Sequence, residues 1–156
     1  MDQLNVKEFE IETDIILSFL YEKIEKISDF LKPQWNMDYN YDDGVLLFAI
    51  IQHPHEDSAD VLQETEYQED KNYQENSNEN NVEEDKEEAY QMYSFLINKN
   101  TPSGKIWYSS PVSKPKYYEF DIESRKWLES TEKTDIVKDT LKDINLIQAF
   151  NNEIVF

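Results

Sequence analysis

The strongest constraint on the fold is the dipeptide Asp43-Gly44, which separates two different apolar patterns. Before it, residues 35–41 alternate aromatic or apolar residues with polar ones. After it, residues 45–51 form an almost unbroken apolar run. Asp-Gly between two such segments favours a tight two-residue turn with both central residues at positive φ. The sequence therefore predicts a β-hairpin whose second strand lies inside a sheet.

Three segments show the three- and four-residue spacing of apolar residues that is typical of amphipathic helices. The first covers residues 13–31 and ends before Pro33, and the second covers residues 82–98. The third covers residues 134–150. We expect each of these helices to pack one apolar face on the core.

Short strand patterns occur at residues 105–112, 116–122 and 126–129. Strands in runs between helices, with links of hairpin length, favour an α+β fold with an antiparallel sheet. The expectation is one domain over residues 1–156, with about four or five strands packed against about three amphipathic helices. Residues 52–81 lack any periodicity and are expected to form an acidic low-complexity insertion.

The net charge of −19, from 34 acidic and 15 basic residues, is concentrated in one segment. Residues 56–88 hold fourteen acids and two lysines, and include the related hexapeptides YQEDKN and YQENSN. So negative a chain repels nucleic acid and anionic membranes and favours a basic protein surface as partner. The same segment is also explained as a passive, solvated linker.

Catalytic motifs are lacking. The chain has no cysteine and only two glycines, which excludes disulfides, thiolate chemistry and Gly-rich phosphate loops. His53 and His55 stand close to several carboxylates, but we expect incidental loop residues there and predict no metal site. The sequence thus predicts a protein that is not an enzyme and has no cofactor.

Basic and aromatic residues are interleaved between positions 105 and 127. This pattern can stack single-stranded nucleic acid, but a half-buried sheet whose lysine and arginine stems cover aromatic rings explains it better. The residues are Lys105, Trp107, Tyr108, Lys114, Lys116, Tyr117, Tyr118, Arg125, Lys126 and Trp127.

In size, charge and lack of catalytic residues the chain resembles the acidic inhibitors encoded by phages, including DNA-mimicking anti-CRISPR and anti-restriction proteins. That resemblance implies a cytoplasmic, non-enzymatic inhibitor, in a bacterial or an infected host cell, that binds a basic nuclease, nucleic-acid-binding effector or toxin. It implies no direct contact with nucleic acid or membrane. The expected partner-binding residues are Glu64, Glu66, Tyr67, Glu69, Asp70, Tyr73, Glu75, Glu79, Glu83, Glu84, Asp85, Glu87 and Glu88.

Two alternatives remain open at this point. One is a bacterial immunity protein or antitoxin that neutralises its cognate toxin through the folded domain. The other is an accessory or scaffold protein that forms a homo-oligomer, with its acidity incidental to function.

Overall fold

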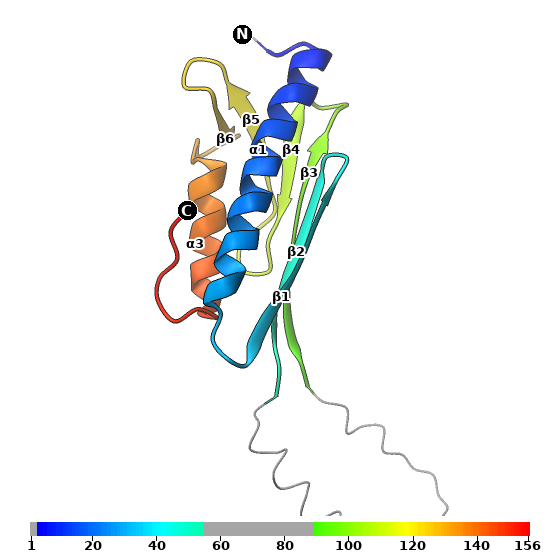
Figure 1. The fold of residues 1–156 in the computed structure, drawn as a ribbon. Helices are drawn as coiled ribbons and strands as arrows, with labels where there is room; N and C mark the ends of the chain where they lie inside the picture. The colour runs from blue at the N-terminus through cyan, green and yellow to red at the C-terminus, as the bar shows by residue number, and fades with distance from the viewer. Residues whose placement is uncertain (1–2, 55–88) are drawn as a thin grey trace, which may run out of the picture.

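A computed structural model describes residues 3–54 and 89–156 as two helices packed on one face of a sheet (Figure 1). In chain order the elements are α1 (Val6–Ile27), the 3₁₀ turn η1 (Ser28–Phe30), β1 (Trp35–Asp42), β2 (Val45–Gln52), β3 (Gln91–Asn100), β4 (Lys105–Ser109), β5 (Lys116–Asp121), β6 (Lys126–Glu129) and α3 (Ile136–Ile147). The six strands form one sheet in the order β1-β2-β3-β4-β5-β6, and every neighbouring pair is antiparallel.

The predicted α+β class with an antiparallel sheet is confirmed, but the predicted number of elements is wrong. The described residues form six strands and two α-helices, where four or five strands and about three helices were expected.

Helix α1 begins seven residues earlier than predicted because of a capping box at its start. The Asn5 side chain accepts a hydrogen bond of 2.8 Å from the backbone N–H of Glu8, and the Glu8 carboxylate accepts one of 3.0 Å from the Asn5 N–H. These reciprocal bonds satisfy two donors that a helix start otherwise leaves free. The buried stripe of α1 runs from Phe9 through Leu17 to Ile24.

The predicted hairpin is present, with its turn at Asp43 and Gly44. Both residues have positive φ, 48° and 78°, as a type I′ turn requires. Asp42 faces Val45 across the turn, and the register continues to Trp35 opposite Gln52. The turn therefore fixes which side chains of β1 and β2 face the helices.

The predicted helix over residues 82–98 is wrong for its described part, because β3 occupies Gln91–Asn100. Phe95 and Ile97 are fully buried, whereas the side chains between them lie on the other face of the sheet. β3 is hydrogen-bonded to β2 on one side and to β4 on the other, and these two ladders satisfy the backbone donors and acceptors of the segment. Tertiary pairing overrides a local pattern that was compatible with both structures.

A buried carboxylate ties α3 to the sheet. Asp143 is 3% exposed and accepts hydrogen bonds of 2.7 Å from the hydroxyls of Tyr108 on β4 and Ser113. One turn earlier, Asp139 accepts a bond of 2.6 Å from the Tyr118 hydroxyl of β5. Three charge-assisted hydrogen bonds to two carboxylates thus set the position of α3 along the sheet.

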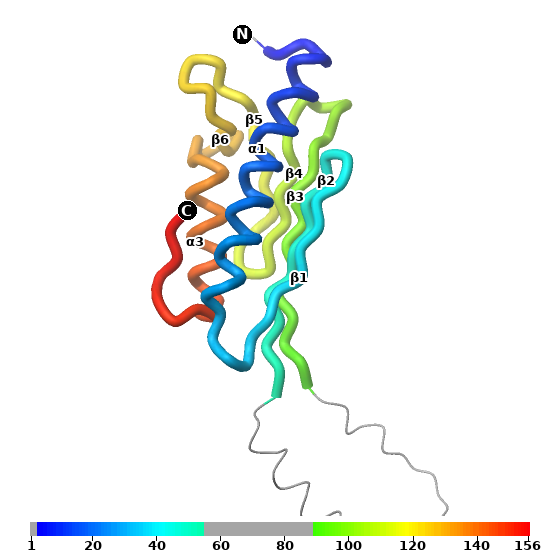
Figure 2. Tube along the Cα trace, viewed as in Figure 1, coloured from blue at the N-terminus to red at the C-terminus, as the bar shows by residue number. Residues whose placement is uncertain are grey.

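The core cluster of the sheet lies on the face that α1 and α3 cover, and both helices run along that one face (Figure 2). Phe48 and Phe95 stack there at 4.3 Å between ring centroids, and Trp127 packs edge-on against Phe9 and Phe120. Because side chains alternate along each strand, the opposite face carries the remaining half of them. Neither described helix covers that second face, which we call the open sheet face.

Replacing Gly44 by Ala is expected to destabilise the fold by about 2 kcal/mol, whereas Gly104→Ala costs about 1 kcal/mol. Both glycines have positive φ, but a Cβ on Gly44 would lie 2.5 to 2.7 Å from three carbons of the Lys99 side chain, and nothing lies within 4 Å of one on Gly104. Urea unfolding of both variants measures the difference. Equal losses would contradict the close packing of Lys99 on the turn.

Stability is expected to fall above pH 10 because burial, together with the bond to Asp143, raises the pKa of Tyr108 above its ordinary 10.0. Above that pH the unfolded chain loses a proton that the folded chain keeps. The tyrosine therefore stabilises the fold fully below pH 10, and its contribution falls by about 1.4 kcal/mol per pH unit above it.

Urea unfolding from pH 8 to 11 tests this, with Tyr108→Phe as the variant and exposed Tyr90→Phe as the control. Tyr108→Phe should lower stability at pH 8 by about 1–2 kcal/mol and show a shallower alkaline decline. An unchanged alkaline slope in Tyr108→Phe would show that this hydroxyl is not responsible.

Candidate functional site

The partner-binding residues expected from the sequence, Glu64 through Glu88, lie outside the described residues. The same holds for His55 and for most of the expected insertion at 52–81. Gln52 and Gln91 are register partners, so the strands on either side of that segment are hydrogen-bonded neighbours. A helix over residues 82–98 was predicted after this segment, but the chain enters strand β3 at Gln91 instead.

His53 has local partners at the end of the sheet opposite the Asp43-Gly44 turn. Its Nε2 lies 2.5 Å from the Asn36 amide oxygen, and its ring packs edge-on against Tyr90. No group of three histidine or acidic side chains within residues 3–54 and 89–156 converges on a metal position.

The interleaved basic and aromatic residues divide between the two faces of the sheet. Tyr108, Tyr118 and Trp127 are buried beneath the helices, whereas Trp107 and Tyr117 lie on the open sheet face. Lys116 lies over the Tyr108 ring and Arg125 over the Phe120 ring. The arrangement agrees with a half-buried sheet whose basic side chains cover aromatic rings.

Four acidic residues lie where the first half of α1 runs beside the turn from β1 into β2 (Figure 1). Glu10 and Asp14 lie one turn apart on α1, whereas Asp42 is the last residue of β1 and Asp43 the first residue of the turn. We call these four residues the acidic edge. The Tyr41 hydroxyl donates a bond of 2.5 Å to Asp14, which joins the helix to the edge strand. Burial and this bond raise the pKa of Tyr41 to about 12.

Lys99 lies within the acidic edge. Its ammonium contacts the Glu10 carboxylate and lies 3.9 Å from that of Asp43. The contact with Lys99 lowers the pKa of Glu10, and the same contact raises the pKa of Lys99. Thr101 adds a bond of 3.3 Å to the second oxygen of Glu10. The edge thus already holds one positive charge among four negative ones.

The donor set of the acidic edge suits hard or borderline cations, which prefer carboxylate oxygens. Asp42 and Asp43 are exposed, and Glu10 is only partly covered. Because no three of the described carboxylates converge, an ion held here would keep part of its water shell. Such an arrangement binds cations weakly and leaves them accessible.

The open sheet face carries an exposed apolar band. Leu47 on β2 is 45% exposed, Met92 on β3 is 60% exposed and Tyr117 on β5 is 39% exposed. Trp107 of β4 lies beside Tyr117, with 4.9 Å between ring centroids. Exposed apolar side chains of four neighbouring strands thus lie on one face of the sheet, and this is typical of a protein-binding surface.

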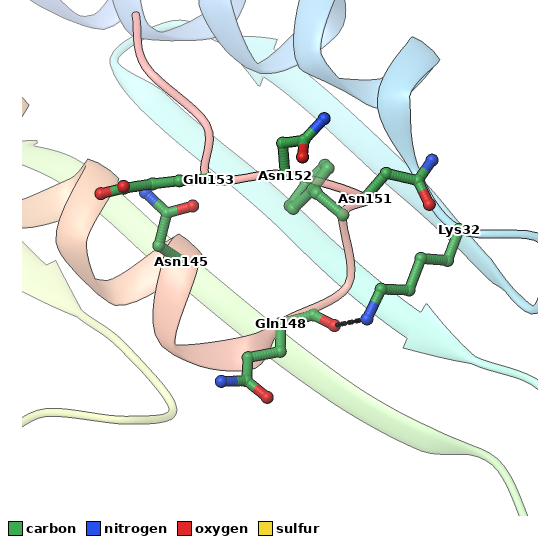
Figure 3. A pocket seen from close by; sticks show the side chains of 7 residues that line it. Lys32, Asn145, Gln148, Asn151, Asn152 and Glu153 are labelled. Atoms are coloured by element: carbon green, nitrogen blue, oxygen red, sulfur yellow. Dashed lines mark hydrogen bonds between the residues drawn. The ribbon is translucent and has the colours of Figure 1, made fainter.

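A pocket of about 360 Å³ lies between Lys32 and the C-terminal tail (Figure 3). Lys32 donates a bond of 3.1 Å from Nζ to the backbone carbonyl of Gln148. The Asn145 side-chain amide donates to the Ile154 carbonyl and accepts from the Ile154 N–H. The side chains that line it are mostly amides, and two of the polar ones already bond the backbone. We interpret the pocket as the seam that holds the tail against α3.

The fold and these two surfaces define a small α+β protein with a one-sided sheet, an exposed acidic edge and an uncovered apolar sheet face. Residues 51–148 match the model of the frataxin-like domain, and that range is more than half of the chain. The chain therefore belongs to the frataxin-like family.

Individual relatives agree with this assignment. The chain is 33% identical over 60 residues to a protein of Dictyostelium discoideum named "Frataxin, mitochondrial", an alignment that covers 38% of this chain and 31% of that protein. It is 52% identical over 33 residues to "Frataxin homolog, mitochondrial" of Schizosaccharomyces pombe, which covers 21% of each. The alignments thus span at most about a third of either relative.

The fold itself is that of a solved frataxin. A structure of frataxin from Psychromonas ingrahamii superposes with a TM-score of 0.56 over 97% of this chain and 100% of that one, at 14% identity. At this level of identity the likeness concerns the fold.

Family membership overturns the functional hypothesis from charge. The phage-type acidic inhibitor, the DNA mimic and the nuclease, effector or toxin as partner are all wrong, because the chain matches proteins of the frataxin/CyaY family. Proteins of different function can be strongly acidic, and net charge alone did not distinguish a phage-type inhibitor from a member of this family. In the part of the chain that the structure describes, no helix is long and apolar enough to cross a membrane.

Sequence reasoning missed the acidic edge, although two signals for it were present. Glu10 and Asp14 have the i, i+4 spacing that places them on one face of a helix. Asp42 and Asp43 are part of the hairpin turn that was predicted. What the sequence did not show was that α1 extends back past Glu10 and packs beside this turn.

Proposed function

We propose that this chain is a non-enzymatic iron-binding protein of Fe–S cluster assembly. The observation that carries the proposal is its membership of the frataxin/CyaY family, whose function is iron binding and Fe–S cluster assembly. The acidic edge and the open sheet face supply the two surfaces that such a role needs.

In this proposal the acidic edge holds ferrous iron as cargo. One or two of the carboxylates of Glu10, Asp14, Asp42 and Asp43 at a time supply oxygen ligands, and water completes the coordination sphere. The sites are exposed, so iron can pass to another protein without a rearrangement of the core.

The open sheet face serves as the docking surface for a protein of the Fe–S assembly machinery. Trp107 and Tyr117 are rigid aromatic side chains at the β4–β5 end of the exposed apolar band, and such residues dominate binding energies at interfaces. Lys105 lies over the Tyr117 ring and pairs with Glu119 at 3.2 Å, which gives the band a polar rim.

The absence of an enzymatic role remains part of the proposal. The pocket beside Lys32 brings together amides and surface charges, and the tyrosines with the largest pKa shifts bond to α3 inside the core. The location in the cell is also a prediction: cytoplasm was expected from the sequence, whereas the names of two relatives specify mitochondria.

Neutralising the acidic edge should weaken the binding of Fe²⁺. The test variant combines Glu10→Gln, Asp14→Asn, Asp42→Asn and Asp43→Asn, and we expect at least tenfold weaker binding by anaerobic calorimetry because the carboxylate ligands are gone.

The matched control removes four exposed carboxylates elsewhere: Glu25→Gln, Asp29→Asn, Glu132→Gln and Glu153→Gln. It changes the net charge by the same amount and should leave the affinity within about twofold, since distant surface charges are screened by salt. An equal loss in both variants would mean that Fe²⁺ responds only to overall charge and would overturn the assignment of the edge.

Trp107→Ala should abolish the capture of purified Fe–S assembly proteins on the immobilised full-length chain or weaken it by more than tenfold, because truncating a large aromatic side chain at an interface removes a binding hot spot. Leu146→Ala is the control, since Leu146 is 57% exposed on α3, on the other side of the molecule. If Leu146→Ala lost capture and Trp107→Ala kept it, the docking surface would be the helical layer.

A further inference from the structure

We propose that Lys99 is a built-in competitor for the cation site of the acidic edge: its ammonium occupies the carboxylates that iron would use and keeps iron affinity low. This inference deepens the proposed iron-binding function and rests on it. It makes Lys99 of β3 the residue that sets the Fe²⁺ affinity of the acidic edge.

The backbone places Lys99 there. Lys99 is near the end of β3, and its backbone N–H bonds the Gly44 carbonyl at 2.9 Å. Its side chain then crosses directly over Gly44, so closely that a Cβ at that position would collide with three of its carbons. A glycine at the turn is what allows the lysine stem to pass from the sheet to α1.

The ammonium is held by carboxylates from separate parts of the chain. Of the four ion pairs within residues 3–54 and 89–156, Lys99 makes two, one with Glu10 of α1 and one with Asp43 of the turn. The charge of Asp14 adds to the same field. The Lys99 side chain is only 22% exposed, whereas that of Asp43 is 88% exposed. The cation is therefore fixed in position while one of its partners remains open to solvent.

A lysine in this position opposes a metal ion in two ways. It uses oxygen lone pairs of Glu10 that would otherwise coordinate the ion, and it places a positive charge next to the ion. At separations of about 4–5 Å, a unit charge acting on a divalent ion through water changes affinity by roughly tenfold, and salt reduces the effect. Fe²⁺ bound at Glu10 must therefore displace Lys99 or bind beside it at a disadvantage.

The test compares Fe²⁺ binding to the wild-type chain, Lys99→Met and Lys99→Arg by anaerobic calorimetry. Methionine keeps most of the stem over Gly44 and removes the charge, so we expect about tenfold tighter binding. Arginine keeps the charge and should leave the affinity within about twofold of wild type. Lys138→Met removes an exposed lysine of α3 and controls for net charge, and it should also leave the affinity unchanged.

A purely structural role for Lys99 predicts a different result. Loss of a tie between α1 and the sheet would lower the melting temperature and loosen the edge, so that Lys99→Met would bind Fe²⁺ as weakly as wild type or more weakly. That result would overturn the inference. Lys99→Gln is a second neutral variant in case Lys99→Met does not fold, and it too must bind more tightly than wild type.

A measurement on the unaltered protein completes the test. In NMR spectra, Fe²⁺ should shift or broaden the ε-methylene signals of Lys99 at the same concentrations at which it binds. If Fe²⁺ binds wild type and the neutral variants equally, the competitor role fails while iron binding stands. If wild type binds no more Fe²⁺ than the neutralised-edge variant, the iron-binding function itself fails.

Discussion

The structure depends on the burial of only one face of its sheet. Two helices cover the side that carries Phe48, Phe95 and Tyr108, and six strands with alternating side chains must then present their other residues to the outside. The apolar residues that remain there, Trp107 among them, cannot be explained by the core of this chain. A partner protein is the simplest physical reason for them.

The same arrangement creates the acidic edge. Because α1 packs beside the edge strand, residues about thirty positions apart in sequence, such as Asp14 and Tyr41, become hydrogen-bonded neighbours. The type I′ turn completes the site by exposing Asp42 and Asp43 and by leaving space above Gly44 for Lys99. One two-residue turn therefore sets the register of the hairpin, two of the proposed ligands and the path of their competitor.

The sequence predicted those parts of the fold that are determined locally. The Asp43-Gly44 turn, the β-strands after residue 105 and helix α3 follow from turn chemistry and short-range periodicity. β3 did not follow, because Met92, Tyr93 and Leu96 also match helical spacing, and only pairing with β2 and β4 decides between the two. The start of α1 was missed for a different reason: the capping box at Asn5 and Glu8 lies before the first strong apolar periodicity.

The candidate site was less predictable than the fold, because charge was the wrong guide. The segment 56–88 holds most of the net charge, and it drew the functional interpretation toward a partner-binding acidic arm. The acidic edge holds only four carboxylates, and what sets it apart is that a helix lies beside a turn, which composition does not record. The contact of Lys99 with Glu10 distinguishes this edge from the rest of an acidic surface, and that contact is known only from the structure.

Weak binding is an advantage for a protein that transfers a metal ion. A closed site with three or four convergent ligands would hold Fe²⁺ firmly, and its release would require the site to open. The acidic edge has exposed ligands and a resident ammonium that can take the place of the departing ion. When iron leaves, Lys99 can return to Glu10, so the carboxylates are not left unpaired and part of the electrostatic cost of release is offset. Under the proposed function, the lysine that lowers affinity also makes release easier, and both effects come from the same contact.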